Sequence, residues 1–85
     1  MKLSIVMPVY NEERTLEEIA LKVLETPYEK ELIMVDDGSR DSSREIMQRL
    51  EAEHPQVRCF YHERNSGKGG ALSTGFKEVQ GDVVI

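Results

Sequence analysis

Short apolar runs alternate along the chain with stretches of helical periodicity. Residues 3–7, 32–35, 57–61 and 83–85 have the length and the aliphatic, β-branched content typical of strands. The first run ends at Pro8, whose ring removes a ladder donor and suits the end of a strand. Charged residues flank the second run on both sides and predict its limits. The pattern therefore predicts four short strands.

Three helical patterns lie between these runs. In the first, apolar residues recur at i, i+3, i+4, i+7 and i+8, which predicts one stripe facing a core: Leu16, Ile19, Ala20, Val23 and Leu24. Asn11 or Thr15 would cap this helix, and Pro27 would end it. The acidic residues of its first half, Glu12 included, are expected on a solvated face.

The second and third helices follow the same logic. Ile46, Met47 and Leu50 share one face of the second, with Ser39 or Asp41 as its cap and Pro55 as its stop. The third helix carries four apolar residues and ends at Gly81: Ala71, Leu72, Phe76 and Val79.

The resulting order, β-α-β-α-β-α-β, predicts an α/β fold with a mostly parallel sheet, right-handed crossovers and helices on both faces, in three layers. A parallel sheet seldom finishes on a three-residue strand such as residues 83–85. We therefore expect residues 1–85 to form a single truncated domain, the N-terminal piece of a larger one.

Composition narrows the class of protein. The 85 residues include 11 Lys and Arg against 16 Asp and Glu, a net charge of -5. This balance argues against nonspecific binding to nucleic acid or anionic membrane, which needs clustered basic residues. The single cysteine, Cys59, cannot form an internal disulfide and is expected in the core. Neither a signal peptide nor a run of ~20 apolar residues is present, so we expect a soluble cytoplasmic protein.

Polar or glycine-rich segments follow the first three predicted strands, at residues 8–12, 36–39 and 65–70. In an open parallel sheet, ligands bind outside the carboxyl ends of the strands. These segments are therefore the candidate site.

Asp36 and Asp37 end the second strand, and adjacent strand residues point to opposite faces, so only one can face a given pocket. A carboxylate there could accept hydrogen bonds from a ribose hydroxyl or a base N–H. Alternatively, Asp-Asp-Gly-Ser is only a turn and helix cap, with Gly38 at positive φ.

Tyr10 and Glu12 follow the first strand. Tyr10 could stack on a base, and Glu12 could accept a hydrogen bond from the N–H groups of a base. Alternatively, Tyr10 is partly buried and Glu12 complements a helix dipole.

The loop at residues 65–70 resembles phosphate-binding loops but fails both tests. Gly70 and Gly75 have the Walker spacing, yet Phe76 follows where Lys is needed. Leu72 occupies the last glycine position of the dinucleotide fingerprint. What remains is a flexible loop that brings Lys68 near a helix N-terminus, where a diphosphate could lie. Its glycines could instead serve close packing of the helix on the sheet.

The remaining candidate groups carry no recognisable chemistry. His54 precedes Pro55 at a helix end and is expected to cap it. For His62, just past the third strand, the sequence offers no partner for nucleophilic or metal chemistry, and Asp82 is expected to be a solvated turn residue. With no Asp-x-Asp and no metal-spaced Cys/His cluster in the chain, we predict no catalytic residue and no metal ligand.

Three motifs in order nevertheless resemble family 2 glycosyltransferases. They are residues 5–12 (IVMPVYNE), residues 35–39 (VDDGS) with Asp41, and residues 65–71 (NSGKGGA) with Gly75 and Phe76. The Gly-Lys-Gly loop is similar to the dolichol-phosphate mannose synthase and polyprenyl-phosphate glycosyltransferase branch. The resemblance implies the N-terminal half of a GT-A fold, which binds the nucleotide of a sugar donor. The positions that it assigns to the nucleotide are Pro8, Tyr10, Glu12, Val35, Asp37 and Lys68.

The resemblance also implies a reaction. The complete enzyme would move a sugar from a GDP- or UDP-sugar to a lipid-phosphate or saccharide acceptor, with Mg²⁺ or Mn²⁺ on the diphosphate. The family's Asp-x-Asp metal motif follows the fourth strand, and its catalytic region comes later. We therefore expect this chain alone to bind no metal and to be inactive, and any membrane association to depend on downstream parts, at the cytoplasmic face.

Two alternatives stay open at this point. The chain could be an inert structural fragment that forms homo-oligomers through an exposed edge strand. It could also belong to another nucleotide-binding class, such as a nucleotidyltransferase or half of a dehydrogenase.

Overall fold

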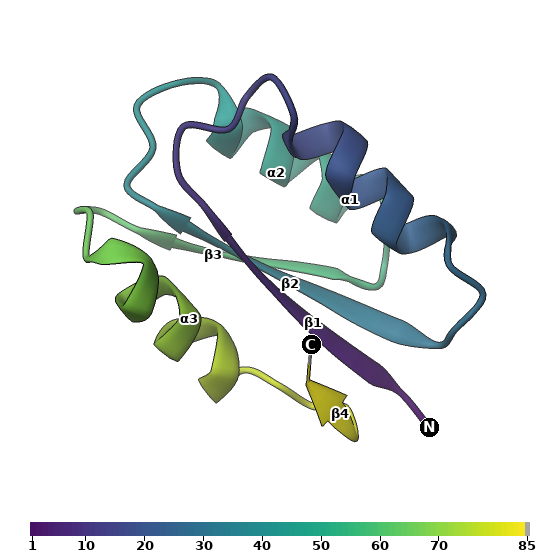
Figure 1. Cartoon of the computed structure of the whole chain (residues 1–85). Coiled ribbons are helices and arrows are strands. Elements are labelled where there is room, and N and C mark those ends of the chain that lie inside the picture. Colours follow the sequence, from purple (N-terminus) through teal and green to yellow (C-terminus); the bar gives the residue numbers. More distant parts are fainter. Residues whose placement is uncertain (85) are drawn as a thin grey trace.

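The computed structural model describes residues 1–84 and shows four strands and three helices (Figure 1). In chain order the elements are β1 (Leu3–Val9), α1 (Leu16–Glu25), β2 (Lys30–Asp37), α2 (Ser43–Glu53), β3 (Val57–His62), α3 (Gly67–Lys77) and β4 (Val83–Val84). The strands form one parallel sheet in the order β3-β2-β1-β4. The predicted α/β class and element order are confirmed; Ile85, in the predicted fourth strand, lies outside the described residues.

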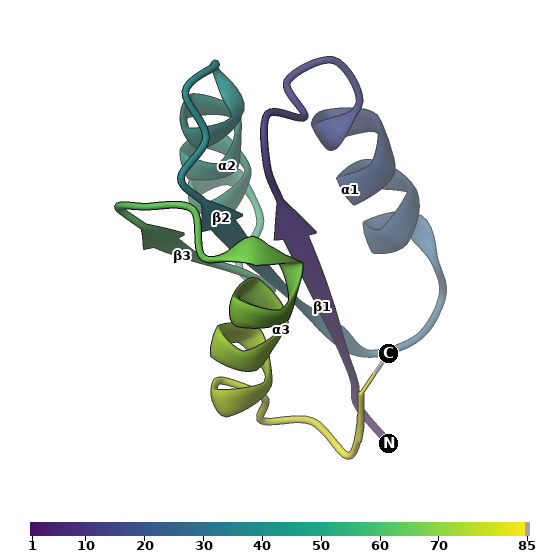
Figure 2. The same ribbon diagram turned by 60° about the vertical axis from the view of Figure 1, so that its left-hand side comes forward.

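The helices cover both faces of the sheet. Helices α1 and α2 lie on one face and α3 on the other (Figures 1 and 2). The chain runs from β1 to β2 to β3 in one direction and then returns past β1 to β4, so a right-handed crossover places α3 opposite the first two helices. This reversal at β1 is the point where parallel sheets bind ligands, at the carboxyl ends of the strands.

Two apolar clusters flank the sheet. The larger lies under α1 and α2 and contains Val9, Leu16, Ala20, Leu32, Met34, Met47, Leu50 and Val57. The smaller lies under α3 and contains Ile33, Val35 and Ala71. Successive residues of β2 thus pack into opposite clusters, because side chains alternate across a strand and helices cover both faces of the sheet.

Strand β2 extends beyond its predicted limits at both ends. All eight of its residues are buried, including the charged ones at its ends. Charge does not end the strand because other groups of the fold pair with it: Lys30 Nζ donates to the Thr26 carbonyl at 2.7 Å. Glu31 Oε2 accepts from Ser4 Oγ at 2.6 Å and from the Gln80 N–H at 2.7 Å. Burial favours a higher pKa for Glu31, but these hydrogen bonds outweigh it and lower the pKa.

Helix α3 begins earlier than predicted. Gly67 to Gly70 form its first turn, where a flexible loop was expected, and the helix ends at Lys77. Phe76, one of the apolar residues of this helix, is 53% exposed. Val79 lies past the helix but packs against the smaller cluster.

The other two helices differ from prediction in detail. Ile19 is 48% exposed and so lies outside the buried stripe of α1. Thr15 is the N-cap residue of that helix, but its hydroxyl donates to Glu12 Oε2 instead of capping. The N-cap residue of α2 is Ser42, neither Ser39 nor Asp41, although Asp41 Oδ1 accepts from the Ser43 N–H at 2.9 Å.

Candidate functional site

A pocket of about 350 Å³ opens at the carboxyl edge of the sheet. The end of β1 and the loop after it, the last residue of β2, the loop after β3 and the start of α3 contribute to its wall. It is lined by Pro8, Val9, Tyr10, Glu12, Asp37, Asn65, Gly67, Lys68 and Ala71. The fold thus brings together five of the six residues predicted for the site. Val35 is the exception, because its side chain is fully buried in the cluster under α3.

The loop after β1 supplies Tyr10 and Glu12. Tyr10 is 46% exposed beside the pocket, which leaves its ring accessible to a ligand. Between them, Asn11 adopts a left-handed backbone conformation with φ of 51°, which Asn tolerates better than most residues. The main-chain N–H of Glu12 donates to Ser43 Oγ at 2.9 Å, which anchors the loop to α2.

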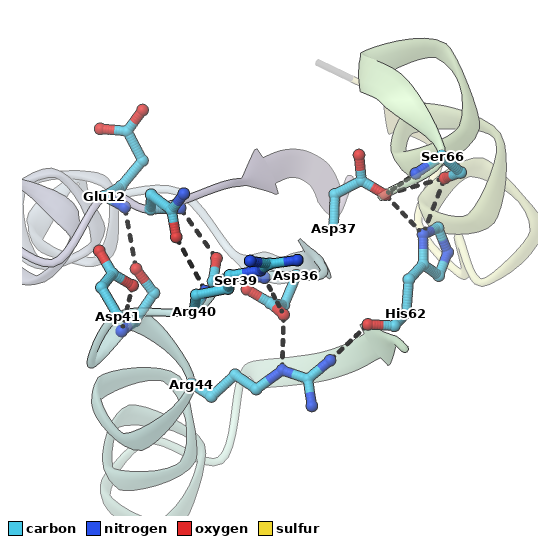
Figure 3. Close-up of polar contacts among 11 residues, drawn as sticks. Glu12, Asp36, Asp37, Ser39, Arg40, Asp41, Arg44, His62 and Ser66 are labelled. Atoms are coloured by element: carbon cyan, nitrogen blue, oxygen red, sulfur yellow. Dashed lines mark hydrogen bonds and ion pairs between the residues drawn. The ribbon is translucent and has the colours of Figure 1, made fainter. Parts of the chain in front are cut away.

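Reciprocal hydrogen bonds join this loop to the loop after β2 (Figure 3). The Asn11 N–H donates to Ser39 Oγ at 2.9 Å, and the Arg40 N–H donates back to Asn11 Oδ1 at 2.9 Å. The Glu13 N–H likewise donates to Asp41 Oδ2, at 3.2 Å. Because each loop satisfies main-chain groups of the other, Tyr10 and Glu12 are held in a fixed relation to Asp37 at the end of β2.

Asp36 and Asp37 point to opposite faces, as the strand period predicts (Figure 3). Asp36 is fully buried on the α2 side, where Oδ2 accepts from Arg44 Nε at 2.7 Å and from the Ser39 N–H at 3.1 Å. Gly38 follows with φ of 80°, so the turn expected for this segment is present. The hydrogen bonds of Asp36 therefore tie the turn after β2 to α2, which is a structural role.

Asp37 faces the pocket on the α3 side. Its Oδ1 accepts from the Ser66 N–H at 2.8 Å, from Ser66 Oγ at 2.8 Å and from His62 Nδ1 at 2.9 Å. Burial acts to raise the pKa of Asp37, but these donors stabilise the carboxylate more and lower its pKa to about 2. Asp37 is therefore a fixed negative charge at the pocket wall at any physiological pH.

His62 is the polar residue whose role the sequence did not reveal. It ends β3 directly beside Asp37 in the parallel register, and its Nε2 lies 2.8 Å from Thr74 Oγ1 of α3. The sequence offered it no partner for nucleophilic or metal chemistry, and it did not predict these hydrogen bonds. Its position at the end of the third strand, as Asp37 stands at the end of the second, could have suggested that the two residues are neighbours. Only the register of the two strands shows that their side chains meet.

The first turn of α3 supplies the positive charge. Lys68, in the first turn of α3, is exposed and lines the pocket, and it forms no ion pair within residues 1–84. Two carboxylates and one ammonium group therefore meet at the pocket. Such a set can accept hydrogen bonds from a base or ribose and neutralise an anionic group beside them.

Glu12 and Asp37 are the carboxylates among the residues that line the pocket. Nowhere in the described part of the chain do three or more Asp, Glu, His or Cys side chains gather as metal ligands would. Oxygen Oδ1 of Asp37 is already occupied by three donors. A Mg²⁺ or Mn²⁺ ion would need ligands from elsewhere.

The comparison with known proteins assigns the family. Residues 4–85 match Glycosyl transferase family 2. The chain belongs to this family. An undecaprenyl-phosphate 4-deoxy-4-formamido-L-arabinose transferase of Pseudomonas fluorescens is 41% identical over 96% of the chain, which spans 26% of that protein. A bactoprenol glucosyl transferase of Shigella phage SfV is 38% identical over 100% of the chain and 29% of its own length.

Solved structures agree with the fold. The mannosyltransferase PcManGT of Pyrobaculum calidifontis, in complex with GDP-Man and Mn²⁺, matches with a TM-score of 0.88 and 26% identity over 96% of this chain and 25% of its own. TarS 1-349 of S. aureus, in complex with UDP, matches with a TM-score of 0.90 and 27% identity over 100% of this chain and 26% of its own. The predicted GT-A fold is confirmed.

The chain spans about a quarter of the length of these relatives. Membership of a glycosyltransferase family argues against the alternative of a nucleotidyltransferase or dehydrogenase half. Within residues 1–84, no helix has both the length and the apolar character required to cross a bilayer.

Proposed function

We propose that this chain binds the nucleotide of a GDP- or UDP-sugar in the pocket at the carboxyl ends of β1 and β2, beside the start of α3. The observation that carries the proposal is the convergence of Tyr10, Asp37 and Lys68 on one cavity at the switch point of the sheet. Tyr10 offers a stacking surface, Asp37 a fixed acceptor, and Lys68 a charge for the diphosphate.

The relatives support a polyprenyl-phosphate acceptor for the complete enzyme. Two of them are named for undecaprenyl-phosphate or bactoprenol substrates. Transfer to such a lipid would occur at a membrane surface, and we place it at the cytoplasmic face. A divalent cation would assist the complete enzyme, with ligands from outside the described residues, because those residues do not supply them.

A titration of the 85-residue chain with UDP and with GDP tests nucleotide binding. In a ¹⁵N–¹H correlation spectrum we expect shifts at Tyr10, Glu12 and Asp37, with a dissociation constant on the order of 1 mM, or about -4 kcal/mol. Asp37→Asn should weaken binding about tenfold. Glu29→Gln, an exposed change at the opposite edge of the sheet, should have no effect. A dispersed spectrum whose peaks do not shift with either nucleotide at saturating concentration would refute the proposal.

We further propose that the 85 residues alone transfer no sugar. The chain contains no Asp-x-Asp sequence. Incubation with UDP-glucose or GDP-mannose, polyprenyl phosphate and Mn²⁺ should give no turnover above a blank without protein. Turnover above that blank would contradict this part of the proposal.

The structural alternative has one specific observation in its favour: β3 is an edge strand of the sheet. Its unpaired main-chain groups could bind a second copy of the chain. Light scattering tests this self-association at chain concentrations between about 10 µM and 1 mM, which are on the order of those used for the titration. A molecular mass that doubles as the concentration rises, together with a spectrum that neither UDP nor GDP changes, would favour the alternative.

A further inference from the structure

Strand β3 stands at one end of the strand order β3-β2-β1-β4 of the described residues, so one of its edges faces outward. In a parallel pair, alternate residues of a strand direct their main-chain groups toward the neighbour. The Leu32 N–H of β2 donates to the Gln56 carbonyl at 2.9 Å, so the even-numbered residues of β3 face β2. The main-chain groups of Val57, Cys59 and Tyr61 therefore point outward, where a further strand can add.

Two of these three outward N–H groups are bonded within the chain. The Val57 N–H donates at 3.0 Å to the carbonyl of His54, the C-cap residue of α2, so the turn between helix and strand accounts for it. The Cys59 N–H donates to Glu51 Oε2 at 2.9 Å, and this bond depends on a side chain from the last turn of α2. The carboxylate of Glu51 thus lies where the carbonyl of an added strand would bind, in the middle of the edge.

The charge of Glu51 is not neutralised by a neighbouring cation. Within residues 1–84 its carboxylate forms no ion pair, whereas Glu53, two residues further along the same helix, lies 3.6 Å from Arg49. Glu51 is also exposed, so its negative charge faces anything that approaches the edge. An incoming strand presents carbonyl oxygens, which a carboxylate repels, and charged side chains protect the edge strands of many sheets in this way.

We propose that Glu51 closes the outer edge of β3 against a second copy of the chain, and that its removal turns this edge into an interface between two copies. A strand that pairs with β3 needs the Cys59 N–H and must displace the carboxylate, which breaks a charge-assisted hydrogen bond. In a dimer with a twofold axis, both copies lose that bond. Neither Glu51 nor Cys59 lines the pocket, so the inference is independent of nucleotide binding. It argues against self-association of the unmodified chain through β3.

The test measures the molecular mass of the 85-residue chain and three variants by light scattering, from about 10 µM to 1 mM. The wild-type chain should stay monomeric, which puts its dissociation constant above about 1 mM. Glu51→Ala should dimerise with a dissociation constant at least about tenfold lower, because one hydrogen bond to a charged group is worth that factor or more. Glu51→Gln keeps an acceptor oxygen without the charge and should lie between the two. Glu53→Ala, the same change of charge on the same helix, is the matched control and should stay monomeric.

A ¹⁵N–¹H correlation spectrum locates the interface. As Glu51→Ala dimerises, the amide peaks of Cys59 and Tyr61, which point outward, should shift more than those of Arg58 and Phe60, which face β2. A monomeric Glu51→Ala, or a dimer whose shifts lie outside β3, would overturn the inference. A wild-type chain that dimerises through Cys59 and Tyr61 would overturn it too, and so would equal association of Glu53→Ala, which would make net charge the cause.

A second readout needs no association. At concentrations where both chains are monomeric, the Cys59 amide hydrogen should exchange with solvent about tenfold faster in Glu51→Ala than in the wild-type chain, because its hydrogen bond is gone. The Val57 amide, bonded to the His54 carbonyl, should exchange at the same rate in both. Equal rates at Cys59 would show that the carboxylate does not hold the edge, and would overturn the inference. Should Glu51→Ala fail to fold, Glu51→Gln carries the same comparisons.

Discussion

Asp37 carries its negative charge in a position almost removed from solvent, with 5% of its side chain exposed. Such a group stays ionised only because Ser66 and His62 donate to it. Those donors exist only in the folded chain, so the ionised group links folding to pH. The direction follows from the pKa, which is lowered from 3.8 to about 2 on folding. The unfolded chain therefore binds the proton more tightly.

We predict that Asp37 stabilises the fold fully above pH 5 and that this contribution, at most about 2 kcal/mol, is lost as the pH falls from 4 toward 2. Urea unfolding at a series of pH values measures it. Asp37→Asn should show a smaller loss of stability over the same range, because its side chain does not titrate. Equal losses in the two proteins would contradict the predicted pKa shift.

At the scale of elements, the position of α3 depends on one close approach. A Cβ atom added at Gly75 would collide with Val6 Cγ1 of β1 and touch Val35 Cγ2 of β2 at 3.5 Å. Glycine at this position lets the helix lie directly on the strands beneath the pocket. Gly69, two turns earlier on the same helix, has nothing within 4 Å of such an atom.

We therefore predict opposite effects for two identical substitutions in α3. Gly75→Ala should destabilise the fold by about 1–3 kcal/mol, because Val6 is stiff and the helix must move outward. Gly69→Ala should stabilise it by about 0.5–1 kcal/mol through the lower entropy of the unfolded chain. Urea midpoints of both variants test the pair, and equal effects would mean that close packing is not the function of Gly75.

The connection between the first two loops yields a second prediction at this scale. Asn11 combines a φ of 51° with a hydrogen bond from the Arg40 N–H. Asn11→Gly loses only the hydrogen bond and should cost about 1 kcal/mol, whereas Asn11→Ala also forces a Cβ into the left-handed region and should cost about 1–2 kcal/mol more. Thermal or urea unfolding distinguishes them. Should alanine prove as stable as glycine, backbone strain would not be the reason for Asn at this position.

At the scale of the whole molecule, the sequence predicted what depends on local period and chain order. The alternation of apolar runs with helical patterns was sufficient to predict the α/β class, the parallel direction of the strands and the edge of the sheet at which the candidate site lies. The prediction from the sequence failed where a charged residue has a partner far away in the chain. Glu31 lies inside β2 because Ser4 and Gln80, 27 and 49 positions away, donate hydrogen bonds to its carboxylate. His62 was missed for the same reason, since its contact with Asp37 depends on the register of two strands.

Cys59 gives a probe of the whole fold, because it is the single cysteine. Its side chain packs against the cluster under α1 and α2, and its Sγ lies 3.5 Å from the Met47 carbonyl. Burial, and then the Glu51 carboxylate, raise the pKa of the thiol to about 12. Only the thiolate reacts with alkylating reagents, and at pH 8 its fraction is roughly 10³-fold below that of a free cysteine.

We therefore predict that iodoacetamide modifies the folded chain roughly a thousandfold more slowly than the chain in concentrated urea. Because Cys59 contacts the main cluster, the labelling rate should rise with urea in parallel with the unfolded fraction seen by circular dichroism. Asp37→Asn and Gly75→Ala should raise the rate by the factor that their loss of stability predicts. Fast labelling of a chain that is fully folded by circular dichroism would instead show that β3, an edge strand, opens independently of the rest of the sheet.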